Sequence, residues 1–79
     1  MSNLKKYITA FTSTFLIEES NLNGLKYQDI AAWDSVGHMG LMAELEEVFG
    51  IEMDIDDIIE FSSFEVGRAI LKKYNVSME

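Results

Sequence analysis

The sequence predicts an all-α domain, a small antiparallel bundle of three longer helices and one short helix formed by residues 1–79. Apolar residues recur at helical spacing in successive segments, helix-start signals precede two of these segments, and the chain contains no proline. Because the chain also lacks cysteine, no disulfide or thiolate metal site can hold it together. The fold must therefore depend on packing, for which 48% hydrophobic residues suffice in a single small core.

The first predicted helix covers about residues 3–17 and is followed by a long loop. Its apolar stripe consists of Leu4, Ile8, Phe11 and Phe15. Residues 7–15 also alternate in polarity, as a strand would, but the helical stripe extends further along the chain. The run Asn-Leu-Asn-Gly at 21–24 is typical of a turn and opens a loop to Trp33. We expect Ile30 and Trp33 to anchor that loop on the core.

The second predicted helix runs from Ser35 to Phe49. Asp34 is a favourable N-cap residue, because its carboxylate can accept hydrogen bonds from the free amides of the first turn. Gly50 suits the left-handed conformation that often ends a helix. The side chains expected to face inward are Leu41, Met42, Leu45, Val48 and Phe49.

Two further helices complete the predicted bundle. The short one covers residues 56–60, with Ile55, Ile58 and Ile59 expected to face inward. The last one begins at a Ser-x-x-Glu capping box formed by Ser62 and Glu65. Its predicted inward face comprises Phe64, Gly67, Ile70, Leu71 and Tyr74. Lys72 and Lys73 lie near its C-terminal end, where the helix dipole favours cations.

Negative charge is concentrated in the second half of the chain. The net charge is −8, from 14 acidic and 6 basic residues. Residues 44–65 contain no basic residue and nine acidic ones, namely Glu44, Glu46, Glu47, Glu52, Asp54, Asp56, Asp57, Glu60 and Glu65. Such a surface repels nucleic acid and anionic membranes and attracts basic protein surfaces, although it also suits a purely solubilising face.

Neither a membrane-spanning segment nor a signal peptide is indicated. No apolar run approaches the roughly 20 residues that cross a bilayer, and the lysine-containing N-terminus is not followed by a long apolar stretch. We therefore expect a soluble, cytoplasmic, monomeric protein.

The sequence gives little support for catalysis by the chain itself. His38 follows Ser35 by three residues and could share a helix face with it, but neither an orienting third group nor an oxyanion site is indicated. His38 is either a hydrogen-bonded structural residue or part of the surface near Ser35. A calcium loop starting at Asp54 fails, because Ile58 and Ile59 occupy its fifth and sixth positions. We predict neither catalytic residues nor a metal site.

The segment around Ser35 carries the one distinctive pattern. Taken alone, Ser35 could be an ordinary first-turn serine. Asp34-Ser35-Val36 is, however, followed at fixed spacing by Leu41, Leu45-Glu46-Glu47, Phe49 and Ile51-Glu52. Residues 31–71 resemble the phosphopantetheine-bearing core of acyl carrier proteins, and the first helix and loop fit in length and pattern. The resemblance implies an acyl-carrier-like fold over 1–79.

The resemblance also implies a function. A separate phosphopantetheinyl transferase would attach phosphopantetheine from coenzyme A to Ser35, and Asp34 would cap the helix and support the metal site of that transferase. The carrier would then hold acyl intermediates as thioesters, in fatty-acid-like, polyketide or surface-glycan biosynthesis. An aminoacyl carrier, such as a D-alanyl carrier, is the alternative within the family. An acidic interaction module without a prosthetic group is a more remote one.

Helix geometry indicates a surface on which partner enzymes could dock. A semi-apolar strip at i+3 and i+4 spacing comprises Val36, Met39, Gly40, Ala43 and Glu47. The acids expected to border or extend it are Glu44, Glu46, Glu47, Asp54, Asp56 and Asp57. In the family such a surface docks on basic patches of synthases, ligases and transferases. Gly37 and Gly40 depart from the polar or acidic residues of familiar fatty-acid carriers, either by tolerated drift or to permit close approach of a partner or the arm.

Overall fold

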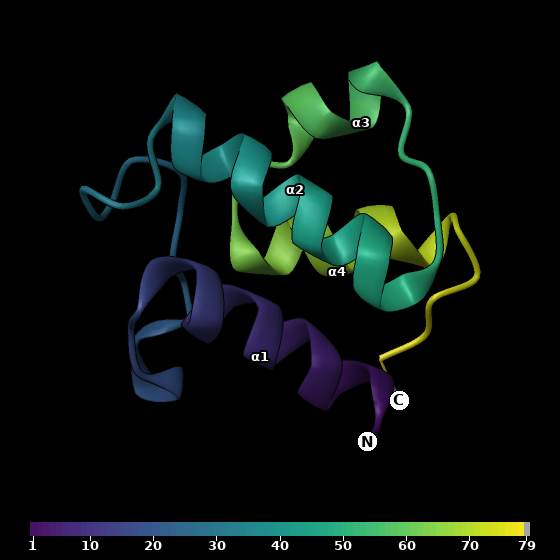
Figure 1. Ribbon diagram of the computed structural model, residues 1–79, viewed down its shortest axis with the longest axis horizontal. Helices are drawn as coiled ribbons and strands as arrows, with labels where there is room; N and C mark the ends of the chain where they lie inside the picture. Colours follow the sequence, from purple (N-terminus) through teal and green to yellow (C-terminus); the bar gives the residue numbers. More distant parts are fainter. Residues whose placement is uncertain (79) are drawn as a thin grey trace.

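The structure is a computed structural model that describes residues 1–78, and it is all-helical, as predicted. Its elements are α1 (Asn3–Phe15), the 3-10 turn η1 (Glu19–Asn21), α2 (Ser35–Phe49), α3 (Ile55–Glu60) and α4 (Phe64–Lys72). Helix α1 runs antiparallel to α2, while α4 lies behind α2 and α3 lies at the opposite side from α1 (Figure 1). Within residues 1–78 the only extended pairing is an isolated bridge between Lys26 and Ser63.

The boundaries of α2 are those that the sequence predicts. The Asp34 carboxylate accepts a hydrogen bond from the Gly37 amide at 2.8 Å, so Asp34 is the N-cap. At the other end Gly50 adopts the left-handed conformation, with φ of 63°, and stops the helix. The α1 helix ends two residues earlier than predicted, because Leu16 turns left-handed with φ of 54°.

An aromatic cluster forms the core between α1, α2 and α4. Phe11 lies at its centre, with ring-centroid distances of 5.0 Å to Tyr7, 5.2 Å to Phe64 and 5.4 Å to Trp33. Trp33 is completely buried and, as expected, anchors the end of the long loop, with partly buried Ile30 packed beside the core. The predicted inward faces of α2 and α4 are confirmed at Leu41, Met42, Leu45, Phe64, Gly67, Ile70 and Leu71, which are buried.

The prediction that Ile55 and Ile59 of the short helix face inward is wrong. The side chains of Ile55 and Ile59 do not face inward, because they are 73% and 74% exposed. The buried position on α3 belongs instead to Asp57, which pairs with Lys73 and Tyr74 after α4. A carboxylate can occupy that position because both its oxygens have partners.

The start of α4 also differs from the predicted capping box. Ser63, not Ser62, is the N-cap, and its hydroxyl accepts a hydrogen bond from the Val66 amide at 3.0 Å. Glu65 does not reach back to the cap but accepts a hydrogen bond from the Gly24 amide of the long loop at 3.0 Å. This carboxylate therefore joins the loop to α4 rather than completing the helix end.

Candidate functional site

The site around Ser35 is built by a capped helix start and a closely packed loop. Ser35 is the first residue of α2, and its side chain is exposed. The loop before it is fixed by hydrogen bonds from the Gln28 amide to the Trp33 carbonyl and from the Trp33 amide to the Ile30 carbonyl. With Asp34 also held by the Gly37 amide, Ser35 lies at a defined position at the edge of the bundle.

Gly37 is needed for that loop to approach α2. A Cβ atom at position 37 would lie 1.9 Å from the Ala32 carbonyl oxygen, far inside van der Waals contact. At Gly40 the nearest neighbour of such an atom would be a Thr14 methyl at 3.9 Å, an ordinary contact. Gly37 therefore permits the close approach of the chain's own backbone, whereas nothing in the structure requires a glycine at position 40.

His38 is a structural residue rather than a base for Ser35. Its Nδ1 accepts a hydrogen bond from the Trp33 indole at 2.9 Å, and its Nε2 lies 2.8 Å from the Ile58 carbonyl oxygen. The indole can only donate and the carbonyl can only accept, so the ring must be the neutral tautomer with its proton on Nε2. Both nitrogens are thereby occupied in joining the loop, α2 and α3, and neither is available to activate Ser35.

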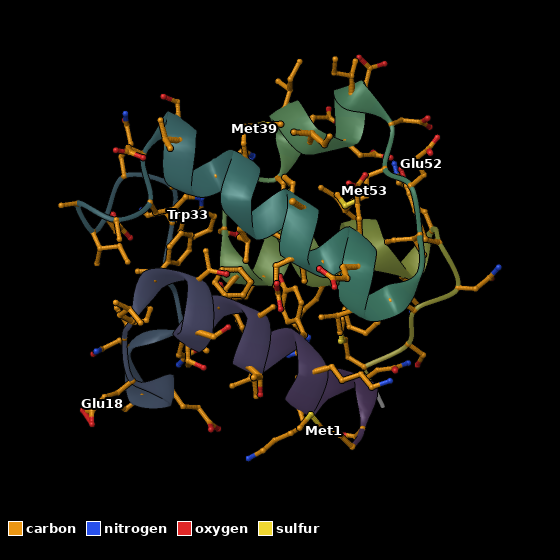
Figure 2. The ribbon with its side chains drawn as sticks, viewed as in Figure 1. Met1, Glu18, Trp33, Met39, Glu52 and Met53 are labelled. Atoms are coloured by element: carbon orange, nitrogen blue, oxygen red, sulfur yellow. The ribbon has the colours of Figure 1, made fainter. Side chains whose placement is uncertain are left out.

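A shallow apolar groove of about 340 Å³ runs from Ser35 between α2 and α3. Its walls are Met39 on α2 and Ile58 and Ile59 on α3, and its floor includes His38 and Phe61. Tyr27 closes one side and is held there by the hydrogen bond from its amide to the Ser62 carbonyl at 2.9 Å. Figure 2 shows Met39 on the side of α2 that faces α3, and Trp33 on the side that faces α1.

The predicted semi-apolar strip is on the surface. All five of its members are exposed, namely Val36, Met39, Gly40, Ala43 and Glu47. The exposed side chains of Ile55 and Ile59 add apolar area on α3, where Ile59 also forms part of the groove wall. Sequence reasoning missed this extension, because it assigned both isoleucines to the core.

The predicted acidic border is only partly free. Asp54 and Asp56 are exposed and Glu44 is half-buried, so their charges can face a partner. Glu46 is half-buried and accepts a hydrogen bond from the Met53 amide at 2.9 Å, which ties α2 to the segment before α3. Its charge is therefore partly committed to the fold.

Asp57 is a correction to the predicted docking surface, because it is 6% exposed and forms an internal ion pair with Lys73. Hydrogen bonds from Lys73 and then Tyr74 hold the pKa of its carboxyl below the usual value. The Tyr74 hydroxyl, which donates a hydrogen bond to Asp57, also accepts one from the Asp54 amide at 3.0 Å. Asp57 thus attaches α3 to the end of α4 and does not present its charge to a partner.

Three broader observations complete the description. Among residues 1–78, no three or more His, Asp or Glu side chains are grouped so as to hold a metal ion. Nor does any helix in that range have the length and apolar character needed to cross a membrane. No protein-family model matches the chain, and no significant similarity to a curated protein or a solved structure is found.

Proposed function

We propose that this chain is a carrier protein that holds acyl intermediates as thioesters on a phosphopantetheine group attached to Ser35. The observation that carries the proposal is an exposed serine at an Asp-capped helix start, where the nearby His38 is engaged through both ring nitrogens and cannot activate it. Such a hydroxyl is suited to modification by another enzyme rather than to nucleophilic catalysis of its own. The chain would then be the substrate and partner of enzymes, not an enzyme.

The surroundings of Ser35 fit the group. Its phosphodiester is anionic, and the first amides of the fifteen-residue helix α2, at Ser35 and Val36, have no partner within the helix. Asp34 fixes the helix start through the Gly37 amide and so holds these donors in place. When bound, phosphopantetheine supplies a thiol on a flexible arm, which carries the cargo as a thioester. The apolar groove begins at the attachment point.

The exposed strip on α2 supports docking of enzymes with basic surfaces. Val36 and Met39 are 79% and 55% exposed beside Ser35, and Glu47 further along α2 and Asp54 and Asp56 at the start of α3 are exposed negative charges. The expected partners are a phosphopantetheinyl transferase and acyl or aminoacyl ligases, synthases and transferases with basic patches. Electrostatic steering gives fast, salt-sensitive encounters, as a shuttle between several enzymes requires.

The test is the intact mass of the protein after incubation with coenzyme A and a broad-specificity phosphopantetheinyl transferase. We expect a gain of one phosphopantetheine in the wild type and none in Ser35→Ala. Ser62→Ala is the matched control, because Ser62 is an exposed serine at the same groove and its loss should leave loading intact. Absence of loading, with a transferase active on another carrier, would refute the proposal and favour an acidic interaction module.

A further inference from the structure

The floor of the groove beside Ser35 is closed by a side-chain bridge. The His38 Nδ1 accepts a hydrogen bond from the Trp33 indole at 2.9 Å, and on the other side of the ring Nε2 donates to the Ile58 carbonyl oxygen at 2.8 Å. The imidazole and indole planes differ by only 15°, with their centroids 6.2 Å apart, so the two rings lie nearly coplanar along this hydrogen bond. The imidazole also meets the Phe61 ring edge-on, with the centroids 6.1 Å apart. Groove and core are therefore separated by one half-buried imidazole and the rings that support it.

Behind this floor the bundle is filled. Trp33 is 0% and Phe61 1% exposed, and both rings pack against Phe11, at 5.4 Å and 6.3 Å between centroids. An apolar chain that the arm on Ser35 delivers to the groove can lie against Met39, Ile58 and Ile59 without disturbing these rings. To go deeper it would have to displace His38, which would leave the buried Trp33 indole without its acceptor.

We infer that His38 is a specificity-determining residue that limits cargo length, so that the groove holds a short apolar acyl group at the surface and longer chains are excluded from the core. This inference rests on the proposed function, because it assigns a cargo class to the arm on Ser35. The walls provide contact for a few carbon atoms, and the hydrogen-bonded floor prevents further insertion.

The test attaches chains of known length without any transferase. A Ser35→Cys variant has a single cysteine, since the native chain has none. Alkyl methanethiosulfonates convert its thiolate to a mixed disulfide and release methanesulfinate, which allows methyl, butyl and octyl adducts to be compared by thermal unfolding. We expect the butyl adduct to melt about 5 °C above the methyl adduct and the octyl adduct to melt no higher than the butyl adduct.

The His38→Ala variant in the same background tests the role of the floor. Both adducts of this variant lack the imidazole, so the stability lost with it does not affect the comparison between them. Without His38 the octyl adduct should melt at a higher temperature than the butyl adduct. A second measurement does not depend on that variant: the Trp33 indole proton signal in nuclear magnetic resonance spectra should be the same for the octyl and butyl adducts with His38 present.

Three results would overturn the inference. The first is an octyl adduct that melts above the butyl adduct while His38 is present. The second is that neither the butyl nor the octyl adduct melts above the methyl adduct. The third is a shift of the Trp33 indole proton signal that occurs in the octyl adduct alone. Failure of the proposed function would instead show itself as unmodified Ser35 in the transferase assay. The two failures are distinguishable, because the adducts form chemically.

Discussion

Replacing Gly37 by alanine should destabilise the fold, whereas the same replacement at Gly40, three residues further along α2, should stabilise it. In both cases a helical glycine becomes alanine, which favours the helix by about 1 kcal/mol. The two positions differ in their surroundings. The added methyl group would lie 1.9 Å from the Ala32 carbonyl oxygen at Gly37, but no closer than 3.9 Å to the Thr14 methyl at Gly40.

The clash at Gly37 outweighs the gain in helix propensity. Its nearest obstacle is backbone, and the Phe15 ring also lies at 3.3 Å, so the loop or the first turn of α2 must move by more than about 1 Å. Overpacking of this kind costs up to about 3 kcal/mol. We therefore expect Gly37→Ala to lose about 2 kcal/mol and Gly40→Ala to gain up to about 1 kcal/mol.

Urea denaturation followed by far-ultraviolet circular dichroism measures both changes, since a shift in midpoint at constant slope is a change in stability. In thermal denaturation, at about 6 °C per kcal/mol for a domain of this size, Tm should fall by about 12 °C for Gly37→Ala and rise by up to about 6 °C for Gly40→Ala. If both variants shift in the same direction by similar amounts, the proposed packing of the loop against α2 is refuted.

Three other predictions concern single side chains. Asp34→Ala should lower the free energy of unfolding by about 1 kcal/mol, because the Gly37 amide loses its acceptor, whereas Asp34→Asn should restore most of it in thermal denaturation. Since the pKa of Asp57 is lowered in the fold, its carboxylate contributes stability that is present above the ordinary pKa of about 3.9 and is lost as the pH falls through the folded-state value. Urea midpoints of wild type and Asp57→Asn should therefore differ by a constant amount near neutral pH and converge below about pH 4; a difference that persists in acid would contradict this. Tyr7→Phe should cost about 1 kcal/mol in urea denaturation, because the buried Tyr7 hydroxyl donates to the Phe64 carbonyl at 2.7 Å, and an unchanged midpoint would show that this bond contributes nothing.

Features that depend on neighbouring residues in the sequence were predictable. The limits of α2 follow from Asp34 and Gly50, whose effects act within one helical turn. The inward faces of α2 and α4 follow from spacing, because these helices are long enough for a stripe to be unambiguous. Ser35 was likewise singled out from its local pattern; the structure places it on the surface, and its role as an attachment point stays a prediction.

Features that depend on residues far apart in the sequence were not predictable. Six residues of α3 are too few for spacing to decide which side faces inward, and the choice of Asp57 over the isoleucines depends on Lys73 and Tyr74 from after α4. Similarly, the N-cap falls on Ser63 rather than on its neighbour, in a segment where the Phe64 amide bonds to the Leu25 carbonyl at 2.9 Å. Adjacent serines look equivalent until the loop that pairs with them is in place.

The hydrogen bond between Trp33 and His38 should make intrinsic tryptophan fluorescence sensitive to changes in the groove. Trp33 is the single tryptophan of the chain, is fully buried, and donates its indole hydrogen to the floor of the groove. Indole emission responds to local polarity and to the group that accepts the indole hydrogen, so any event that lifts or repositions the imidazole should change the intensity or wavelength of intrinsic fluorescence. The proposed loading at Ser35 and docking on α2, like a loosening of α3, should therefore be measurable in real time on the unlabelled molecule.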